Sequence, residues 1–342
     1  MEKLLTVITY KEPEELTTRR GDENRLVHLS KDDRISMQSI DNFKKDKVKG
    51  EVVLDVTGLT ILQYFKICRK LGFFIKNVHF QDSFEKWNRS LLRFFITKDF
   101  TIRKIFFHTW QWIYYVINEI FFSFSLKKAG FISKNESVIC SLSPIKVGLI
   151  SNGVTKGLKR EFQNLPADQK PEFFFFGNAL YEPNFVSLKY FLKHYWTESF
   201  RDEFGKLAIH GWGSEELSSF LEKELCDKIS TEGEFDELET LLKPNRIYLN
   251  PVECGAGIKT RTQEAMLKGI PMLCHSHALE GLPEMKDYPF RYHDKTSFEV
   301  ALREITTNFE KHIPYLKNVQ EIVIKKYDWF KTISEYIDFF SE

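Results

Sequence analysis

Short apolar runs alternate with helical stretches along this sequence, and this alternation constrains the fold more than any other feature. In the first half, strands are predicted over 4–10, 51–56 and 73–80, with a helix over 60–71. Strand, helix and strand in close succession are typical of a βαβ unit. In the second half, strands are predicted over 172–176, 206–210, 246–251 and 270–274, and helices over 183–195, 214–225 and 260–268. We therefore expect two α/β domains, joined near residues 140–170.

The remaining segments complete this outline. Residues 11–34 are polar and charged and are expected to form a loop, and residues 138–143 and 147–150 are expected to be strands. The last 25 or so residues are predicted to be helical, because apolar residues recur on one helix face. In open parallel sheets, ligands bind at the carboxyl ends of the strands, where this chain carries several glycines.

Length and composition agree with a protein of two globular domains. The chain has 342 residues, of which 42% are hydrophobic and 28% charged, so wholesale disorder is excluded. Five cysteines without a CxxC spacing argue against a disulfide framework or a zinc ribbon, and favour a reducing compartment. The first residues, MEKLLTVITY, lack the apolar run and cleavage site of a signal peptide.

Residues 44–128 form a basic block that is rich in aromatic residues. They contain 16 Lys and Arg against 7 Asp and Glu, a net charge of +9, although the whole chain has only +1. Residues 84–128 are expected to be helical, and one face carries Phe106, Trp110, Ile113, Tyr114, Ile117 and Phe121. Packing inside a large domain is the favoured explanation of this face. Contact with a membrane surface is the alternative, whereas polar interruptions make a membrane-spanning helix a poor fit.

The segment Cys254–Met266 is the most informative for chemistry. A strand is predicted to end at Pro251, and glycines then allow backbone N–H groups to turn inward before a helix begins near Thr260. The N-terminal end of a helix attracts anions, and Lys259 adds a full positive charge there. Glu264 lies one turn further on and could accept hydrogen bonds from sugar hydroxyls. The residues alone are compatible either with a site for a ribose-linked diphosphate or with a glycine turn before an ordinary surface helix.

The order of several short motifs resembles the glycosyltransferase family 4 type of GT-B enzyme. The resemblance runs from about Ser151 to Glu284, whereas over residues 1–150 it is faint. The motifs are Ser151-Asn152-Gly153-Val154, Phe176-Gly177-Asn178, Glu182-Pro183-Asn184, Leu207 to Gly213, Gly233, Asn250 to Met266, Gly269-Ile270-Pro271 and Glu280-Gly281-Leu282. The resemblance implies two Rossmann-like domains with a donor cleft between them. Their bounds would be 1–150 for the acceptor side and 151–325 for the donor side, with a helix over 326–342 returning toward the first domain.

The resemblance also implies a donor site. Lys259 would pair with the diphosphate, Glu264 would bind the ribose, and Gly211 would border the base together with Gly233, Glu234 and Phe235. The complete set of implied donor-binding residues is Gly211, Gly233, Glu234, Phe235, Gly255, Gly257, Ile258, Lys259, Thr260, Arg261 and Glu264. Arg261 could equally be a solvated helix residue. No metal or cofactor is expected, because the two cations and the helix end would offset the charge of the leaving diphosphate.

Two departures from the family pattern stand in this sequence. Ala256 occupies the place where such enzymes often carry a glutamate, and an Arg and Lys pair usually found after the first strand of the second domain is missing. In the first domain, His79 and Asp82 follow a predicted strand and are candidates to orient the acceptor hydroxyl, with Lys259 as the third catalytic candidate. A locally hydrogen-bonded histidine is the alternative for His79.

The sequence therefore predicts a retaining glycosyltransferase that uses a nucleotide-sugar donor and a glycan or lipid-linked acceptor, in the synthesis of bacterial surface polysaccharide. We expect a cytoplasmic protein, and a peripheral position on the inner face of the plasma membrane is left open. In that position, basic residues between Lys86 and Lys104 would lie at the headgroups, and Trp87, Phe94 and Phe95 would be inserted. Nucleic acid is not an expected partner. A non-catalytic GT-B subunit and a nucleotide-sugar epimerase remain the alternatives.

Overall fold

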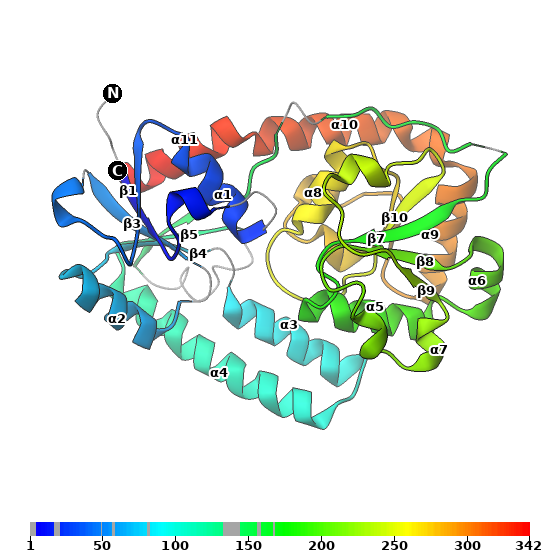
Figure 1. Ribbon diagram of the computed structural model, residues 1–342, viewed down its shortest axis with the longest axis horizontal. Helices are drawn as coiled ribbons and strands as arrows, with labels where there is room; N and C mark the ends of the chain where they lie inside the picture. Colours follow the sequence, from blue (N-terminus) through cyan, green and yellow to red (C-terminus); the bar gives the residue numbers. More distant parts are fainter. Residues whose placement is uncertain are drawn as a thin grey trace.

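The computed structural model contains two parallel β-sheets, each flanked by helices (Figure 1). It describes residues 5–16, 21–48, 50–56, 59–80, 83–132, 144–155, 159–166 and 168–342. The first sheet has the strand order β2-β1-β3-β4-β5-β6. Its strands are β1 (Leu5–Thr9), β2 (Ile35–Ser39), β3 (Glu51–Val56), β4 (Asn77–Phe80), β5 (Lys128–Phe131) and β6 (Lys146–Leu149). All five residues of β1 are buried, as expected for an inner strand of a parallel sheet covered on both faces.

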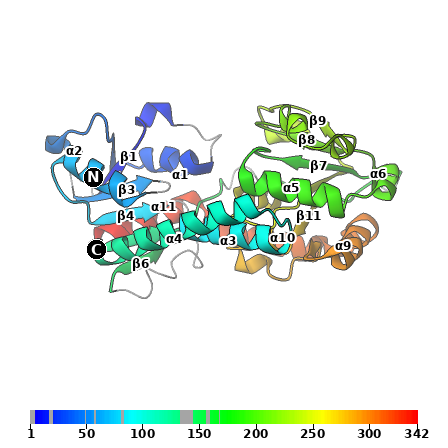
Figure 2. The ribbon, with the colours of Figure 1, turned by 90° about the horizontal axis from the view of Figure 1, so that it is seen from below.

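Helices of the first domain connect these strands. They are α1 (Gly21–Ser30), α2 (Ile61–Leu71), α3 (Phe84–Thr97) and α4 (Ile102–Ser125). Thr60 and Gln63 form a capping box at the start of α2, and Gly72, with φ 76°, ends that helix in the left-handed region. Helices α3 and α4 pack side by side as a hairpin that extends from the first domain toward the second (Figures 1 and 2).

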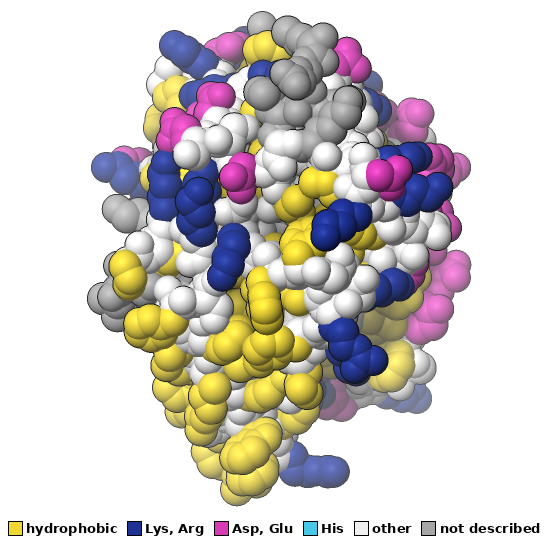
Figure 3. Space-filling view, turned by 90° about the vertical axis from the view of Figure 1, so that its left-hand side faces the viewer, with side chains coloured by type: hydrophobic (Ala, Val, Ile, Leu, Met, Phe, Trp, Pro, Cys, Tyr) yellow, Lys and Arg dark blue, Asp and Glu magenta, His cyan; other side chains and the backbone are white. Residues whose placement is uncertain are grey.

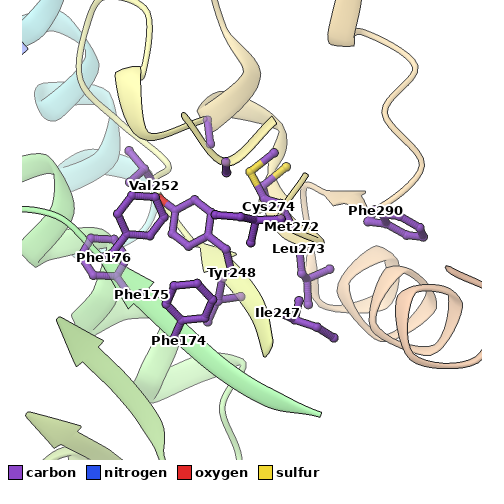
Figure 4. Packing of buried hydrophobic residues seen from close by; sticks show 14 of the residues in the cluster. Phe174, Phe175, Phe176, Ile247, Tyr248, Val252, Met272, Leu273, Cys274 and Phe290 are labelled. Atoms are coloured by element: carbon purple, nitrogen blue, oxygen red, sulfur yellow. The ribbon is translucent and has the colours of Figure 1, made fainter. Parts of the chain in front are cut away.

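The second sheet has the order β12-β11-β10-β7-β8-β9. Its strands are β7 (Glu172–Phe176), β8 (Leu207–His210), β9 (Ile229–Thr231), β10 (Arg246–Asn250), β11 (Met272–His275) and β12 (Arg291–Tyr292). The accompanying helices are α5 (Glu182–His194), α6 (Glu198–Phe204), α7 (Lys223–Cys226), α8 (Thr260–Leu267) and α9 (Lys295–Thr307). Phe174, Phe175 and Phe176 of β7 pack around Tyr248 of β10 in the core of this domain (Figure 4).

Two consecutive helices carry the chain back to the first domain. Helix α10 (Phe309–Tyr327) packs in the core of the second domain, and α11 (Trp329–Ser341) lies on the first sheet (Figure 1). Tyr336, Ile337 and Phe340 of α11 are buried in the same apolar cluster as strand β1. The C-terminal helix is thus a structural part of the N-terminal domain.

Several expectations about local structure were wrong. Residues 11–34 are not all loop, since they include α1, and the strands β2 and β5 were missed. The continuous helix predicted over 214–225 is replaced by a 3₁₀ turn at Leu217–Ser219 and the short α7, because the chain turns over the domain surface there. The strand predicted over 138–143 lies outside the described residues, in the gap between 132 and 144.

The aromatic face of residues 84–128 was also misassigned. Packing in a core was the favoured explanation, but Phe106, Trp110, Ile113, Tyr114 and Ile117 are exposed on α4. Conversely, two residues expected to insert into a membrane, Phe94 and Phe95, are buried between the domains, and Trp87 is half-buried. The reason is that α3 turns Phe94 and Phe95 to the protein interior, whereas the buried residues of α4 are mostly polar.

Candidate donor site between the domains

The order of strands in the second sheet defines where a ligand can bind. From β7, the chain continues to β8 and β9 on one side and returns to β10 on the other side of β7. The point between β7 and β10 is therefore a topological switch point, outside which the loops diverge and leave a crevice. Gly177 follows β7 there, and the loop before α8 follows β10. The sequence motifs thus converge at the position where open α/β sheets bind ligands.

Three glycines bring the backbone of neighbouring strand ends close together. The Gly211 N–H donates to the Gly233 carbonyl at 2.7 Å, and the Gly177 N–H donates to the His210 carbonyl at 3.1 Å. Gly211 has φ 110°, and a Cβ atom on it would lie 2.2 Å from the Gly177 carbonyl oxygen. Only glycine fits at this close contact of strand ends, which we call the seam. The seam leaves a surface of backbone without side chains beside the crevice.

Residues on either side of this seam come together around Phe176. The rings of Phe235 and Phe176 have centroids 6.3 Å apart, and the Arg261 guanidinium lies 5.6 Å from the Phe176 ring centroid. Arg261 donates to the Glu264 carboxylate at 2.5 Å, and both side chains are partly exposed. Glu234 is exposed to solvent. Arg261 is therefore positioned by an aromatic ring and a carboxylate, rather than being free in solvent.

The loop before α8 adopts the predicted turn. Gly255 and Gly257 have φ 105° and 74°, and α8 begins at Thr260. The first N–H groups of a helix have no acceptor within the helix, so those of α8 are directed toward this end. The Lys259 ammonium lies at the same place, where it donates to the carbonyls of Ala256 at 2.7 Å and Gly257 at 3.2 Å. Lys259 thereby fixes the loop and gives it a positive charge.

Helix α3 of the first domain closes over this loop. The Gly255 N–H donates to the Ser90 hydroxyl at 3.0 Å, and the indole N–H of Trp87 donates to the Tyr181 hydroxyl at 2.9 Å. Lys98 pairs with the buried carboxylate of Glu253 at 3.6 Å. Gly255 is therefore engaged by the other domain, so the N–H groups from Gly257 onward are those that fit the predicted anion site.

A charged cluster between the domains was not predicted from the sequence. Lys86 of α3 is buried and lies 3.2 Å from Glu280, whose other carboxylate oxygen lies 3.4 Å from Nδ1 of His277. Burial and the nearby Lys259 lower the pKa of His277 well below its usual value. Interactions with His277, Lys86 and Lys259 lower the pKa of Glu280 despite its burial. From the sequence, Lys86 is expected only among the basic residues at the headgroups, because no sequence signal links it to Glu280, 194 positions away.

Next to this cluster, a cavity of about 860 Å³ opens between the domains. Ile132, Leu149 and Ser151 line it from the first domain, and Ile258, His277 and Glu280 line it from the second. Tyr327 and Lys331, at the junction of α10 and α11, complete the wall. The loop that carries Lys259 thus contributes its neighbour Ile258 to the interdomain space.

His79 is placed away from this site. Its side chain is fully buried under α11, where Nδ1 lies 3.5 Å from Asp55 and Nε2 lies 3.4 Å from the Ile150 carbonyl. Burial and the adjacent Arg25 lower the pKa of His79 to about 3. The expectation that His79 orients an acceptor is corrected accordingly, because the imidazole has no access to the crevice. Asp82 lies outside the described residues.

Within the described ranges, no group of three or more His, Cys, Asp or Glu side chains is arranged to hold a metal ion. In the same part of the chain, none of the helices combines the length and apolarity that crossing a membrane requires.

Comparison with known proteins identifies the fold. No family model and no curated protein matches the sequence. Among solved structures, HepE from Anabaena in complex with UDP and glucose matches with a TM-score of 0.60 at 10% identity, over 98% of both chains. The trehalose-6-phosphate synthase OtsA matches with 0.60 at 11% identity, over 98% of both chains. The lipopolysaccharide outer core galactosyltransferase WaaB matches with 0.52 at 15% identity, over 98% of this chain and 99% of WaaB.

These matches cover both domains, so they concern the whole architecture. The chain has the GT-B fold, with two parallel six-stranded sheets in Rossmann-like domains. The predicted fold class is therefore confirmed. At these identities the likeness establishes the fold and leaves the reaction to be argued from the site.

Proposed function

We propose that this protein is a glycosyltransferase that transfers a sugar from a nucleoside-diphosphate donor. The single observation that carries the proposal is the convergence of Lys259, the N-terminal end of α8 and Arg261 at the switch point of the second sheet. Solved neighbours of the same fold support it, since HepE was solved with UDP and glucose and WaaB is a galactosyltransferase.

The site's chemistry fits a diphosphate leaving group. Positive charge at the end of α8 would stabilise the developing charge on the departing phosphate, a role that fixed cations and helix ends perform well in water-poor sites. Glu264, held by Arg261, would accept hydrogen bonds from the ribose, and the seam of Gly211 and Gly233 beside Phe235 would border the base. The cavity between the domains has room for the donor sugar and an acceptor hydroxyl.

We further propose the finer assignments made from the sequence. The donor sugar is a hexose, transfer proceeds with retention and without a metal ion, and the acceptor is a glycan or a lipid-linked sugar of a bacterial surface polysaccharide. The reaction would take place in the cytoplasm, at the inner face of the plasma membrane.

The test is thermal stabilisation by UDP, GDP, ADP and the matching nucleotide sugars. A ligand at 100 times its Kd stabilises the folded state by about 2.7 kcal/mol, which corresponds to a rise of several degrees in melting temperature. Lys259→Ala should abolish this shift, because it removes the charge at the anion site. The matched control is Lys193→Ala, an exposed lysine of α5 in the same domain, which should keep the full shift. The anomeric configuration of the product would then be read by NMR.

A non-catalytic GT-B subunit is the second candidate. It is favoured by the internal pairing of Arg261 with Glu264 and by the bond from Gly255 to Ser90, which satisfy groups that a donor would otherwise engage. If no nucleotide shifts the melting temperature of the wild-type protein, this candidate replaces the transferase. The epimerase alternative is dropped, since it required His79 as an acid or base at the cleft.

A further inference from the structure

The outward face of α4 is unlike the rest of the protein surface. Eleven of its 24 residues are exposed, of which nine are apolar or aromatic and two are basic. The nine are Ile102, Phe106, Phe107, Trp110, Ile113, Tyr114, Ile117, Ile120 and Phe124. At their exposed fractions they present on the order of 1,000 Å² of apolar side chain, whereas soluble monomers rarely expose contiguous patches above a few hundred Å².

Apart from Phe122, the residues of α4 that are buried against the protein are polar: His108, Asn118 and Ser123. Buried His108 contacts the Asn88 side chain at 3.0 Å, and Asn118 accepts a hydrogen bond from the Ile61 N–H at 2.7 Å. The Trp112 indole donates to Glu85 at 2.7 Å. These hydrogen bonds fix the rotation of α4 about its axis, and they thereby hold its apolar face toward solvent.

Basic side chains surround this face, and no exposed acidic residue lies on α4. Arg103 and Lys104 are exposed at its N-terminal end, where Lys104 also pairs with Glu182 of the second domain, and Lys127 is exposed just beyond its C-terminal end. Neighbouring α2 extends the apolar surface with Leu62 and Phe65, the latter in ring contact with Phe121 of α4. That helix adds the exposed cations Lys66, Arg69 and Lys70. Figure 3, which views the molecule from the left-hand side of Figure 1, shows hydrophobic side chains gathered in its lower part, with Lys and Arg side chains beside them.

We propose that α4 is an interfacial helix that docks the protein on an anionic lipid surface. The helix is about 36 Å long and would lie in the plane of the bilayer, with its aromatic and aliphatic side chains in the interface and the basic residues at the headgroups. A second copy of the chain fits less well. In a two-fold pair with antiparallel helices, Arg103 and Lys104 of one copy would meet the cations near Lys127 of the other.

The docking proposal deepens the membrane location given under the proposed function, but it can be measured without a donor, so the two can fail separately. Combined with that function, it gives the hairpin two roles. Helix α4 contacts lipid on one side, and α3 contacts the loop of Gly255 through Ser90 on the other. The cleft would then lie one helix layer from the headgroups, within reach of a lipid-linked acceptor.

Vesicle flotation of the full chain tests the proposal. The protein should float with vesicles of phosphatidylglycerol and phosphatidylcholine and remain at the bottom with phosphatidylcholine alone. Phe106→Glu and Trp110→Glu should each weaken vesicle binding by about tenfold or more, because a charge replaces an inserted side chain. Arg103→Glu should weaken it by about fivefold or more.

Matched controls separate docking from folding. Phe330 of α11 is 77% exposed, as is Phe106 of α4, but α11 and α4 lie on opposite sides of the molecule (Figure 1). Phe330→Glu should therefore bind vesicles like wild type. Unchanged melting temperatures would show that the variants fold. The proposal is overturned if wild type does not float, if it floats equally with neutral vesicles, or if Phe106→Glu binds as tightly as Phe330→Glu. Sedimentation showing a dimer that Phe106→Glu dissociates, without vesicle binding, would instead assign the face to a second copy.

Discussion

At the scale of single residues, glycines set the backbone geometry of the candidate site on which its charged side chains act. Gly177, Gly211 and Gly233 allow three strand ends to approach within backbone hydrogen-bond distance, and Gly255 and Gly257 allow the turn into α8. A side chain at any of these positions would either strain the backbone or fill the space beside the crevice. Lys259 and Arg261 then act from a backbone that is already fixed.

Substitution of Gly211 by alanine tests this dependence. The new Cβ would lie 2.2 Å from the Gly177 carbonyl oxygen, so the strand ends must separate. We expect a loss of about 2–4 kcal/mol in stability, measured as a lower melting temperature. Gly72→Ala is the control, because Gly72 lies in the left-handed region with φ 76° and has no atom within 4 Å of the added Cβ. It should cost only about 1 kcal/mol, the price of the left-handed backbone. Equal losses in the two variants would contradict a steric role for Gly211.

At the scale of elements, helix α11 and the α3–α4 hairpin hold the two domains together. Helix α11 covers the sheet of the first domain although it belongs to the last residues of the sequence. The α3–α4 hairpin belongs to the first domain but contacts the donor loop of the second. Both elements therefore link the domains: α11 as the continuation of α10, and the hairpin through its contact with the donor loop.

The contribution of α11 can be measured on the helix itself. Phe340 is fully buried, where it contacts Tyr336 and the ring of His79. Phe340→Ala should lower stability by about 3–5 kcal/mol, because it opens a cavity in the core of the first domain. Phe330→Ala, on the exposed side of the same helix, should change stability by no more than about 0.5 kcal/mol. Similar melting temperatures for the two variants would show that α11 does not form part of that core.

At the scale of the whole molecule, burial of neutral histidines couples stability to pH. Burial is the main cause that lowers the pKa of His79 to about 3 and those of His210 and His275 to about 4. Each is therefore neutral in the folded protein at a pH where the unfolded chain, with a histidine pKa near 6.5, binds a proton. Their contribution to stability is present above about pH 6.5 and is lost as the pH falls toward 4.

The expected result is a melting temperature that falls between about pH 7.5 and about pH 5. Each such histidine contributes roughly 1.4 kcal/mol per pH unit below its unfolded pKa. His275→Gln should make this fall smaller, since it removes one protonatable group while keeping an acceptor for the His277 N–H. His293→Gln, at a largely exposed position, should leave the fall as in wild type. A melting temperature that rises toward pH 5 would contradict the assignment.

Over much of the chain, the elements and their order could be predicted from the amino-acid sequence. Apolar periodicity and glycines located β3, α2, β7, α5, β8, β10 and α8 to within a few residues, because these signals are local. The same local signals grouped Lys259, Arg261 and Glu264 at one helix end. The motif series also predicted the GT-B fold, which full-length structural matches confirm.

Which faces of these elements are buried could not be predicted, because it depends on the packing of the folded chain. A helix with aromatic residues at three- and four-residue steps can turn either side to the protein, and for α4 the polar contacts of His108 and Asn118 settle the choice. Periodicity likewise could not tell that His79 lies beneath α11, which is more than 250 residues away in sequence, or that Lys86 meets Glu280. Such pairings depend on how the two domains and the returning helix close on one another, and no local pattern of residues records that closure.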